Sequence, residues 1–217
     1  ISGVSTVALI YLFFKSFMNT RKNATTIVLA IGIFAVCSCA LMYPLFSVSA
    51  RVSDRFVPTV LSLNGTTFFD KASHQEKNVE IDLSDDIAMI EWIQANIKGT
   101  PVIVEAVGDQ YRWNSRISSY TGLPTVLGWP WHQMQQKSNI HPEISRRVFD
   151  VNLLYNTPDI SIKLSVINKY GIDFIIIGQL EKIYYDQNSL NKFYLLEDQG
   201  FLEPVYKERG SVIFKVQ

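Results

Sequence analysis

The longest uncharged stretch of the sequence constrains this chain most. No charged residue occurs from Asn23 to Ala50, whereas nearly all the acids and bases lie beyond Arg51. The run from Thr25 to Ala50 can cross the hydrocarbon core of a bilayer, which takes roughly 20 apolar residues. A second apolar run, Ile1 to Met18, precedes it. A buried helix of a soluble protein is the alternative for each run, but two in series disfavour it. We therefore predict two transmembrane helices.

The charges around these runs predict an orientation. The link between them, Lys15 to Asn23, also holds Arg21 and Lys22 but no acid. Because positive loops tend to stay in the cytoplasm, this link is expected there, and the region after Ala50 is expected outside the cytoplasm. The chain begins in apolar sequence without a methionine. We therefore expect further helices upstream. On this interpretation the chain is the C-terminal end of a multi-pass protein of the cell membrane.

Composition disfavours several classes of function. Twenty basic and twenty acidic residues give a formal net charge of zero, which argues against nucleic acid as a partner. The two cysteines, Cys37 and Cys39, both lie in the apolar run, and their spacing fits no metal or redox motif. The sequence has no phosphate-binding glycine loop, no nucleophile elbow and no zinc spacing. We identify no cofactor and no metal ligands in this chain, although a divalent metal bound elsewhere in a longer protein stays open.

The remainder predicts a connecting segment, residues 51–80, followed by an α/β domain, residues 81–217. Strands alternate with helices, which favours a small, mostly parallel sheet. The last two strands form an antiparallel hairpin turned at Arg209-Gly210. The predicted strands are Val102–Val104, Pro124–Leu127, Phe174–Ile177, Pro204–Lys207 and Ser211–Val216. The predicted helices run from Ser84 to Ile97, from His141 to Tyr155, from Thr157 to a stop at Gly171, and from Leu180 to Leu196.

Aromatic and charged side chains concentrate between Glu105 and Gln136, directly after one predicted strand. Ligands of such sheets collect at the carboxyl ends of strands, and Gly178 to Tyr185 is a second such place. Aromatic faces with carboxylates and an arginine between them suit a carbohydrate or a polar headgroup, because C–H faces stack on rings while hydroxyls meet the charges. The candidate substrate-binding residues are Glu105, Asp109, Tyr111, Arg116, Trp129, His132, Glu181 and Tyr185.

Each candidate also has a structural interpretation. Trp129 and Trp131 could anchor the domain at the lipid headgroups, where tryptophan is enriched. Arg116 could pair with Glu105 or Asp109 only to hold a loop. A single histidine such as His132 is more often a hydrogen-bonded structural residue than a base, and Tyr184-Tyr185 could belong to the core. The distance between Glu105 and Asp109, and hence any acid–base role, is undetermined by the sequence.

The same stretch resembles a known family, the archaeal and Chloroflexi "YYY" membrane proteins of the DUF2298 type. The resemblance covers roughly Arg55 to Gln217, and its membrane part adds little. The most specific motif is Glu105-Ala106-x-Gly108-x-x-Tyr111, followed by Arg116-Ile117-Ser118-x-x-Thr121-Gly122-x-Pro124-Thr125-Val126-Leu127-Gly128-Trp129-x-x-His132. Further matching pieces are Leu63-Asn64-Gly65, Ala88-x-x-x-Trp92, Arg147-x-x-Asp150-Val151, Lys169-Tyr170-Gly171 and Gly178-x-Leu180-Glu181-x-x-Tyr184-Tyr185.

This resemblance implies an architecture like that of the GT-C glycosyltransferases, with many membrane helices, a soluble outer domain and a polyprenyl-phosphate sugar as donor. The catalytic carboxylate of such enzymes lies in an early outer loop, so this chain would bind substrate and not supply the base. One departure concerns an arginine expected shortly after His132, where this chain has Gln135-Gln136-Lys137.

Two other functions stay open from the sequence. The domain could be a non-catalytic assembly or partner-binding module, which an apolar patch around Trp129 and Trp131 without a cleft would favour. It could also act as the lid of a transporter, although the two apolar runs offer few polar side chains.

Overall fold

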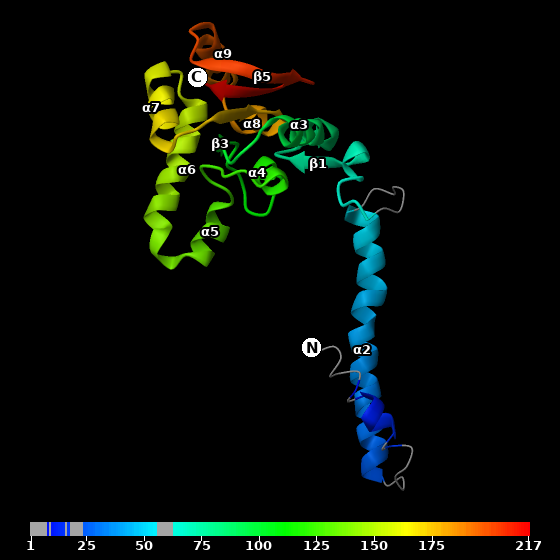
Figure 1. Ribbon diagram of the computed structural model, residues 1–217. Coiled ribbons are helices and arrows are strands. Elements are labelled where there is room, and N and C mark those ends of the chain that lie inside the picture. Colours follow the sequence, from blue (N-terminus) through cyan, green and yellow to red (C-terminus); the bar gives the residue numbers. More distant parts are fainter. Residues whose placement is uncertain (1–7, 9, 16, 18–23, 56–62) are drawn as a thin grey trace. The chain divides into compact units, whose positions relative to one another are not determined.

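The computed structural model describes residues 8, 10–15, 17, 24–55 and 63–217 (Figure 1). The chain divides into two compact units, Ile1–Val57 and Pro58–Gln217. The first unit contains the long helix α2, and the second contains the sheet and the remaining helices named below.

Helix α2 (Ala24–Arg55) is the main element of the first unit. Its segment Ile27–Val52 contains 26 residues and has a mean hydropathy of 2.2. By length and composition this segment is able to cross a membrane. In the described part of the chain this is one such helix, not the two predicted. The other predicted span, Ile1–Met18, falls largely outside the described residues. Because α2 continues to Arg55, the first residues of the predicted connecting segment are helical.

A β-hairpin that the sequence did not indicate lies in the predicted connecting segment. Strands β1 (Ser73–Glu76) and β2 (Val79–Asp82) pair in antiparallel fashion and follow the short 3-10 helix η1 (Phe69–Lys71). The turn residues Lys77 and Asn78 have φ angles of 46° and 65°. Two successive left-handed residues are what a tight hairpin turn requires, so this pair takes the place of the usual Asn-Gly.

Helix α3 (Leu83–Asn96) follows the hairpin directly. Its N-cap is Asp82, whose side chain accepts a hydrogen bond from the Ser84 N–H at 2.9 Å. The sequence predicted Ser84 as the cap, which is wrong by two residues because the helix starts earlier. The spacing of Ile87, Ile90, Ile93 and Ile97 predicts an inward apolar stripe. The first three are buried in the helix, whereas Ile97 is its C-cap and is half-buried.

The main sheet has the strand order β3-β4-β6-β5, from β3 (Ile103–Val104), β4 (Phe174–Ile177), β5 (Leu202–Glu208) and β6 (Ser211–Val216). Only β3 and β4 are parallel, whereas β6 pairs in antiparallel fashion with both β4 and β5. The prediction of a mostly parallel sheet is therefore wrong, although the C-terminal hairpin is confirmed. The hairpin places β6 next to β4, and the predicted strand at 124–127 contributes only an isolated bridge between Ile103 and Thr125.

Six further helices of this unit are α4 to α9, of which α5 lies at the end of α6 away from the sheet (Figure 1). Helix α9 packs on β5, and α6 packs on both α7 and α9. Helix α7 is capped by Asp159 and not by Thr157, and it ends at Gly171 in the left-handed conformation, as predicted. The predicted amphipathic stretch 180–196 is two helices. The bounds are α4 (Arg116–Thr121), α5 (Pro130–Gln136), α6 (His141–Asn156), α7 (Ile160–Tyr170), α8 (Gln179–Tyr184) and α9 (Gln187–Asp198), with the 3-10 helix η2 (Ser138–Ile140) between α5 and α6.

Candidate functional site

Glu105, directly after β3, caps a helix from inside the domain. Its side chain is fully buried, and its two carboxylate oxygens accept hydrogen bonds from the N–H groups of Ile117 and Ser118, each at 2.9 Å. These N–H groups belong to the first turn of α4, where backbone donors have no partner within the helix. Burial raises the pKa of Glu105 and outweighs the opposing effects of Arg116 and of the N–H donors.

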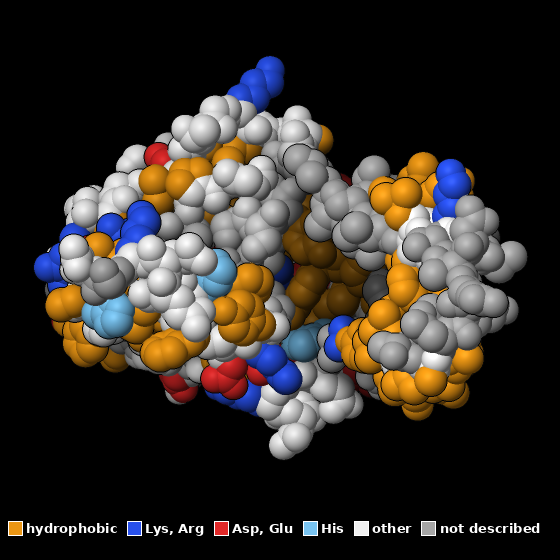
Figure 2. Space-filling model, turned by 90° about the horizontal axis from the view of Figure 1, so that it is seen from below, with side chains coloured by type: hydrophobic (Ala, Val, Ile, Leu, Met, Phe, Trp, Pro, Cys, Tyr) orange, Lys and Arg blue, Asp and Glu red, His pale blue; other side chains and the backbone are white. Residues whose placement is uncertain are grey.

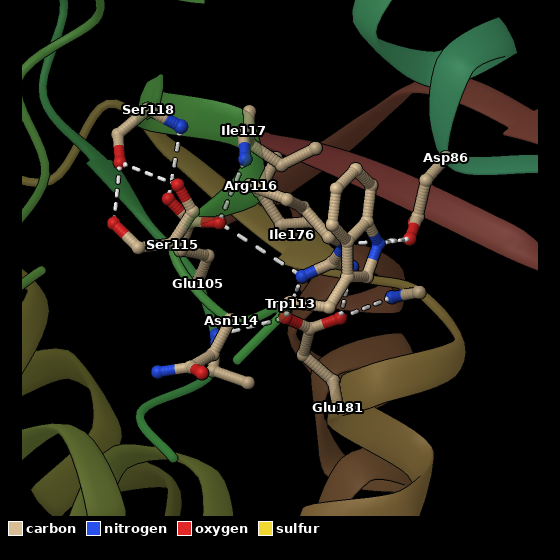
Figure 3. A network of polar contacts seen from close by, with 12 residues as sticks. Asp86, Glu105, Trp113, Asn114, Ser115, Arg116, Ile117, Ser118, Ile176 and Glu181 are labelled. Carbon is tan, nitrogen blue, oxygen red and sulfur yellow. Dashed lines mark hydrogen bonds and ion pairs between the residues drawn. The ribbon is translucent and has the colours of Figure 1, made fainter. Parts of the chain in front are cut away.

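Arg116, the first residue of α4, is the centre of a buried ionic network (Figure 3). Its Nη2 lies 3.0 Å from Oε2 of Glu181, and its Nε lies 2.9 Å from Oδ2 of Asp86. Oε2 of Glu105 is more distant, at 3.8 Å from Nη1. Burial alone lowers the pKa of Arg116, but the charges of Asp86 and Glu181 outweigh it and raise the pKa well above its ordinary value. The guanidinium is therefore charged.

Glu181 ties the two parallel strands to this network. Its Oε1 accepts a hydrogen bond from the Ala106 N–H after β3, and its Oε2 accepts one from the Gly178 N–H after β4, both at 2.8 Å. Burial raises its pKa, but the charge of Arg116 and these donors outweigh burial, and the pKa lies below its ordinary value. We call Asp86, Glu105, Arg116 and Glu181 the buried network.

The buried network fills the crevice in which the sequence predicted a ligand. All four side chains are at most 1% exposed, and a Cβ added at Gly178 would lie 2.8 Å from Nη2 of Arg116. No room for a substrate group is left against these atoms. The geometry gives these side chains the role of holding the ends of β3 and β4, and direct contact with a substrate stays an untested prediction for Glu105, Arg116 and Glu181.

Asp86 is a member of the network that the sequence reasoning missed. From the sequence, Asp86 is expected only to complement the positive N-terminal end of this helix. In the structure it is fully buried and also accepts a hydrogen bond from Nε1 of Trp113 at 2.6 Å. It lies four residues before Ile90 and seven before Ile93, on the apolar face of the helix. That spacing was a usable signal, because a carboxylate on a buried face requires a partner.

Tyr185 is also a residue of the interior. Its ring stacks on that of Tyr155 with centroids 4.5 Å apart, and its hydroxyl oxygen accepts a hydrogen bond from the Val107 N–H at 3.0 Å. Burial raises the pKa of Tyr185. Asp109, by contrast, is exposed and lies four residues beyond Glu105 on the loop after β3.

Three predicted residues come together at the surface, namely Tyr111, Trp129 and His132, which we call the aromatic trio. The ring centroids lie 5.5 Å apart for Tyr111 and Trp129, 5.9 Å for Tyr111 and His132, and 6.4 Å for Trp129 and His132. Tyr111 and His132 are exposed and Trp129 is half-buried. Trp131, two residues after Trp129, is 55% exposed.

Hydrogen bonds hold the aromatic trio in place. Nε1 of Trp129 donates to the carbonyl of Asn114 at 2.9 Å, and the Tyr111 hydroxyl donates to Oε1 of Gln135 at 3.2 Å. Tyr111 has a φ of 57°, a left-handed conformation that tyrosine rarely adopts and that the surrounding contacts must stabilise. The three rings therefore form a preorganised surface and not a set of independently rotating side chains.

A hollow lies next to the aromatic trio, between α5 and α6. It has a cavity volume of about 420 Å³, and polar groups contribute much of its lining. His132 belongs both to the trio and to the wall of this hollow. On the domain face that carries α5 and the start of α6, Figure 2 shows histidine and Lys or Arg side chains among hydrophobic ones. The lining residues are Thr125, Val126, His132, Gln133, Gln136, Lys137, Ile140, Glu143, Ile144 and Arg147.

Within the described residues, no group of three or more His, Cys, Asp or Glu side chains could hold a metal ion. What the hollow and the trio offer is recognition by ring faces, amides and cations.

Comparisons with known proteins give a distant likeness. No protein-family model and no curated protein matches the sequence, so the resemblance to the DUF2298-type proteins gains no support from them. Among solved structures, the chain is similar to the C-terminal globular domain of an oligosaccharyltransferase from Archaeoglobus fulgidus. The similarity covers 61% of this chain and 97% of that domain, with 10% identity and a TM-score of 0.38. So distant a likeness carries no information on what this chain binds.

Proposed function

We propose that residues 63–217 form the substrate-binding outer domain of a membrane glycosyltransferase of the GT-C type. The donor is a sugar linked to polyprenyl phosphate, and the catalytic carboxylate is supplied elsewhere in the protein. The observation that carries the proposal is the aromatic trio beside a polar hollow. An exposed ring surface that ends in hydrogen-bonding groups is the arrangement that a sugar requires, because its C–H faces stack while its hydroxyls accept and donate hydrogen bonds.

The long apolar helix supports a membrane location for the same protein. Side chains along α2 are largely exposed, including Phe34, Leu45 and Phe46, which would be unfavourable in water over such a length. A multi-pass protein with this domain outside the cytoplasm is part of the proposal. A donor whose lipid tail stays in the bilayer would then meet a binding surface tethered to that bilayer.

The rival proposal is a non-catalytic assembly or partner-binding module outside the cytoplasm. The exposed rings of Trp131 and Phe149 favour it, since aromatic side chains are enriched in protein interfaces. The hollow directly beside the trio weighs against it, because a docking patch needs no polar cavity. Both proposals leave the sugar and the acceptor undefined.

Sugar transfer by the complete protein in membranes tests the proposal. We would measure transfer from radiolabelled polyprenyl-phosphate sugars by wild type, His132→Ala and Tyr111→Ala, which change two exposed members of the aromatic trio. The matched control is Phe149→Ala, which removes an exposed ring from α6 without touching the hollow. Lower transfer in the first two variants and normal transfer in the control would support the proposal.

Two outcomes would count against it. Equal transfer by all variants would leave the aromatic trio without a role in binding. Absence of transfer by wild type with every donor would favour the assembly module. Arg116→Ala is unsuitable for this test, since loss of the buried guanidinium is expected to destabilise the domain and would lower transfer for that reason alone.

A further inference from the structure

The charges around the hollow between α5 and α6 are unbalanced. Its one lining carboxylate, Glu143, already interacts with two arginines: Oε1 accepts from Nε of Arg147 at 2.9 Å, and Oε2 accepts from Arg146. Lys137 lines the same hollow and is exposed. No carboxylate among the described side chains lies within ion-pair distance of the Lys137 ammonium. The hollow therefore has a surplus of positive charge.

Arg147 is held in a fixed orientation at the wall of the hollow. Besides its bond to Glu143, its Nη1 donates to the carbonyl of Val126 at 3.0 Å. A guanidinium already fixed by two partners loses little conformational entropy when a remaining N–H donates to a ligand. The Lys137 ammonium complements it as a flexible point charge that can approach an anion from the other side.

Neutral donors complete the lining. The amides of Gln133 and Gln136 and the ring of His132 face the same hollow, and no side-chain hydrogen bond of either glutamine occurs among the described contacts. A volume of about 420 Å³ exceeds what a bare phosphate fills and lies in the range of small-molecule sites. The ligand thus has both an anionic group and a polar body.

We propose that this hollow binds the phosphate ester of a sugar, with Lys137 and Arg147 at the phosphate and the two glutamines at the hydroxyls. This inference rests on the proposed function and assigns the residues that hold the anionic part of its ligand. A phosphate ester could belong to a carrier-linked sugar or to a phospholipid headgroup. The sugar ester is favoured, because the hollow adjoins the aromatic trio through His132.

Direct binding to the complete protein in nanodiscs of neutral phosphatidylcholine tests this assignment. The probes are radiolabelled glucose 1-phosphate, glucose and inorganic phosphate. We expect glucose 1-phosphate to bind most tightly, and Lys137→Gln to weaken its binding by about tenfold, since one charged hydrogen bond is lost. The control Lys192→Gln removes a lysine of α9 outside the hollow and is expected to bind like wild type.

Three results would overturn the assignment. Glucose that binds as tightly as its phosphate would remove the need for an anion site. Unchanged binding by Lys137→Gln would place the phosphate elsewhere. Loss of glucose 1-phosphate binding when phosphatidylglycerol is added to the nanodiscs would identify the occupant as a lipid headgroup.

The assignment and the proposed function fail separately. If Lys137→Gln binds glucose 1-phosphate normally while Tyr111→Ala still lowers sugar transfer, only the hollow is wrongly assigned. If wild type transfers no sugar but binds glucose 1-phosphate through Lys137, the hollow is a phosphate site and the glycosyltransferase proposal is wrong.

Discussion

Two regions of the domain come from one stretch of sequence and differ in almost every physical respect. Glu105 and Arg116 enter the buried network with Asp86 and Glu181, at most 1% exposed. Tyr111 and His132, from the same stretch, lie at the surface beside the hollow. Charge-bearing residues at the ends of parallel strands need not form a ligand site. Burial and mutual pairing decide whether they recognise a ligand or hold the scaffold that presents one.

The largest expected effect tests the buried side of this comparison. Arg116→Met leaves three buried carboxylates without a cation, so we expect a loss of about 3–5 kcal/mol in the free energy of unfolding. Arg146→Met removes an exposed arginine and is the control. Thermal unfolding in detergent, followed by circular dichroism, measures the stability of both variants. If the two variants were equally stable, the network would not be what holds the strand ends.

Lys163 is a buried lysine that no carboxylate pairs with among the described contacts, and it contrasts with the paired Arg116. Lys163 is fully buried, and its ammonium has the carbonyl of Leu154 at 2.6 Å and the ring of Phe193 at 4.0 Å as partners. Burial lowers the pKa of Lys163 to about 7. Above pH 7 the unfolded chain then binds more protons at this lysine than the folded one, so stability rises with pH towards the ordinary pKa near 10.5.

Between pH 7 and pH 8.5 this lysine is expected to add about 1.5 kcal/mol to the free energy of unfolding. Lys163→Met should remove that part of the pH dependence, which denaturant titrations at the two pH values would show. An identical slope in wild type and variant would mean that Lys163 keeps its charge in the folded state, as Arg116 does.

A steric effect smaller than that of Arg116→Met is expected at Gly178. An added Cβ would lie 2.8 Å from Nη2 of Arg116, and Gly178→Ala must displace the guanidinium from Glu181. We expect a cost of about 1–3 kcal/mol, typical of overpacking in an interior. Gly65→Ala is the matched control, because nothing lies within 4 Å of a Cβ there. Unfolding midpoints that do not separate the two variants would show that the network tolerates displacement.

The smallest effect on stability is expected at the surface. Trp131→Ala removes a side chain that is 55% exposed, so the free energy of unfolding should change by less than about 0.5 kcal/mol. The same denaturant titrations measure it. A large destabilisation would show that Trp131 is part of the scaffold, and the distinction between the two regions would fail.

Local patterns predicted the elements of the domain better than their arrangement. The unbroken apolar run of β4 and the periodic stripe of α3 follow from spacing alone, and both are present. The β1–β2 hairpin was missed because its strands are polar and its turn, Lys77-Asn78, lacks glycine. The position of β6 next to β4 depends on contacts between distant segments, which hydrophobic periodicity does not report.

The candidate site shows the same limit. Composition located the aromatic trio, since tyrosine, tryptophan and histidine lie close together in sequence as well as in space. It did not separate these residues from Arg116, whose partners Asp86 and Glu181 lie far away in the chain. The sequence offered Glu105 or Asp109 as partners. Which acids reach the buried Arg116 depends on how α3 and α8 pack. That packing is known only from the three-dimensional structure.

Hydrogen–deuterium exchange of the complete protein, with and without a polyprenyl-phosphate sugar, tests the central distinction most directly. The account predicts slower exchange on ligand addition in α5 and in the segment up to the first turn of α6, residues 130–144, which line most of the hollow. The backbone around Glu105 and Glu181, already sealed by the buried network, should exchange unchanged. Protection at those strand ends, with none in residues 130–144, would place the ligand at the network and contradict the account.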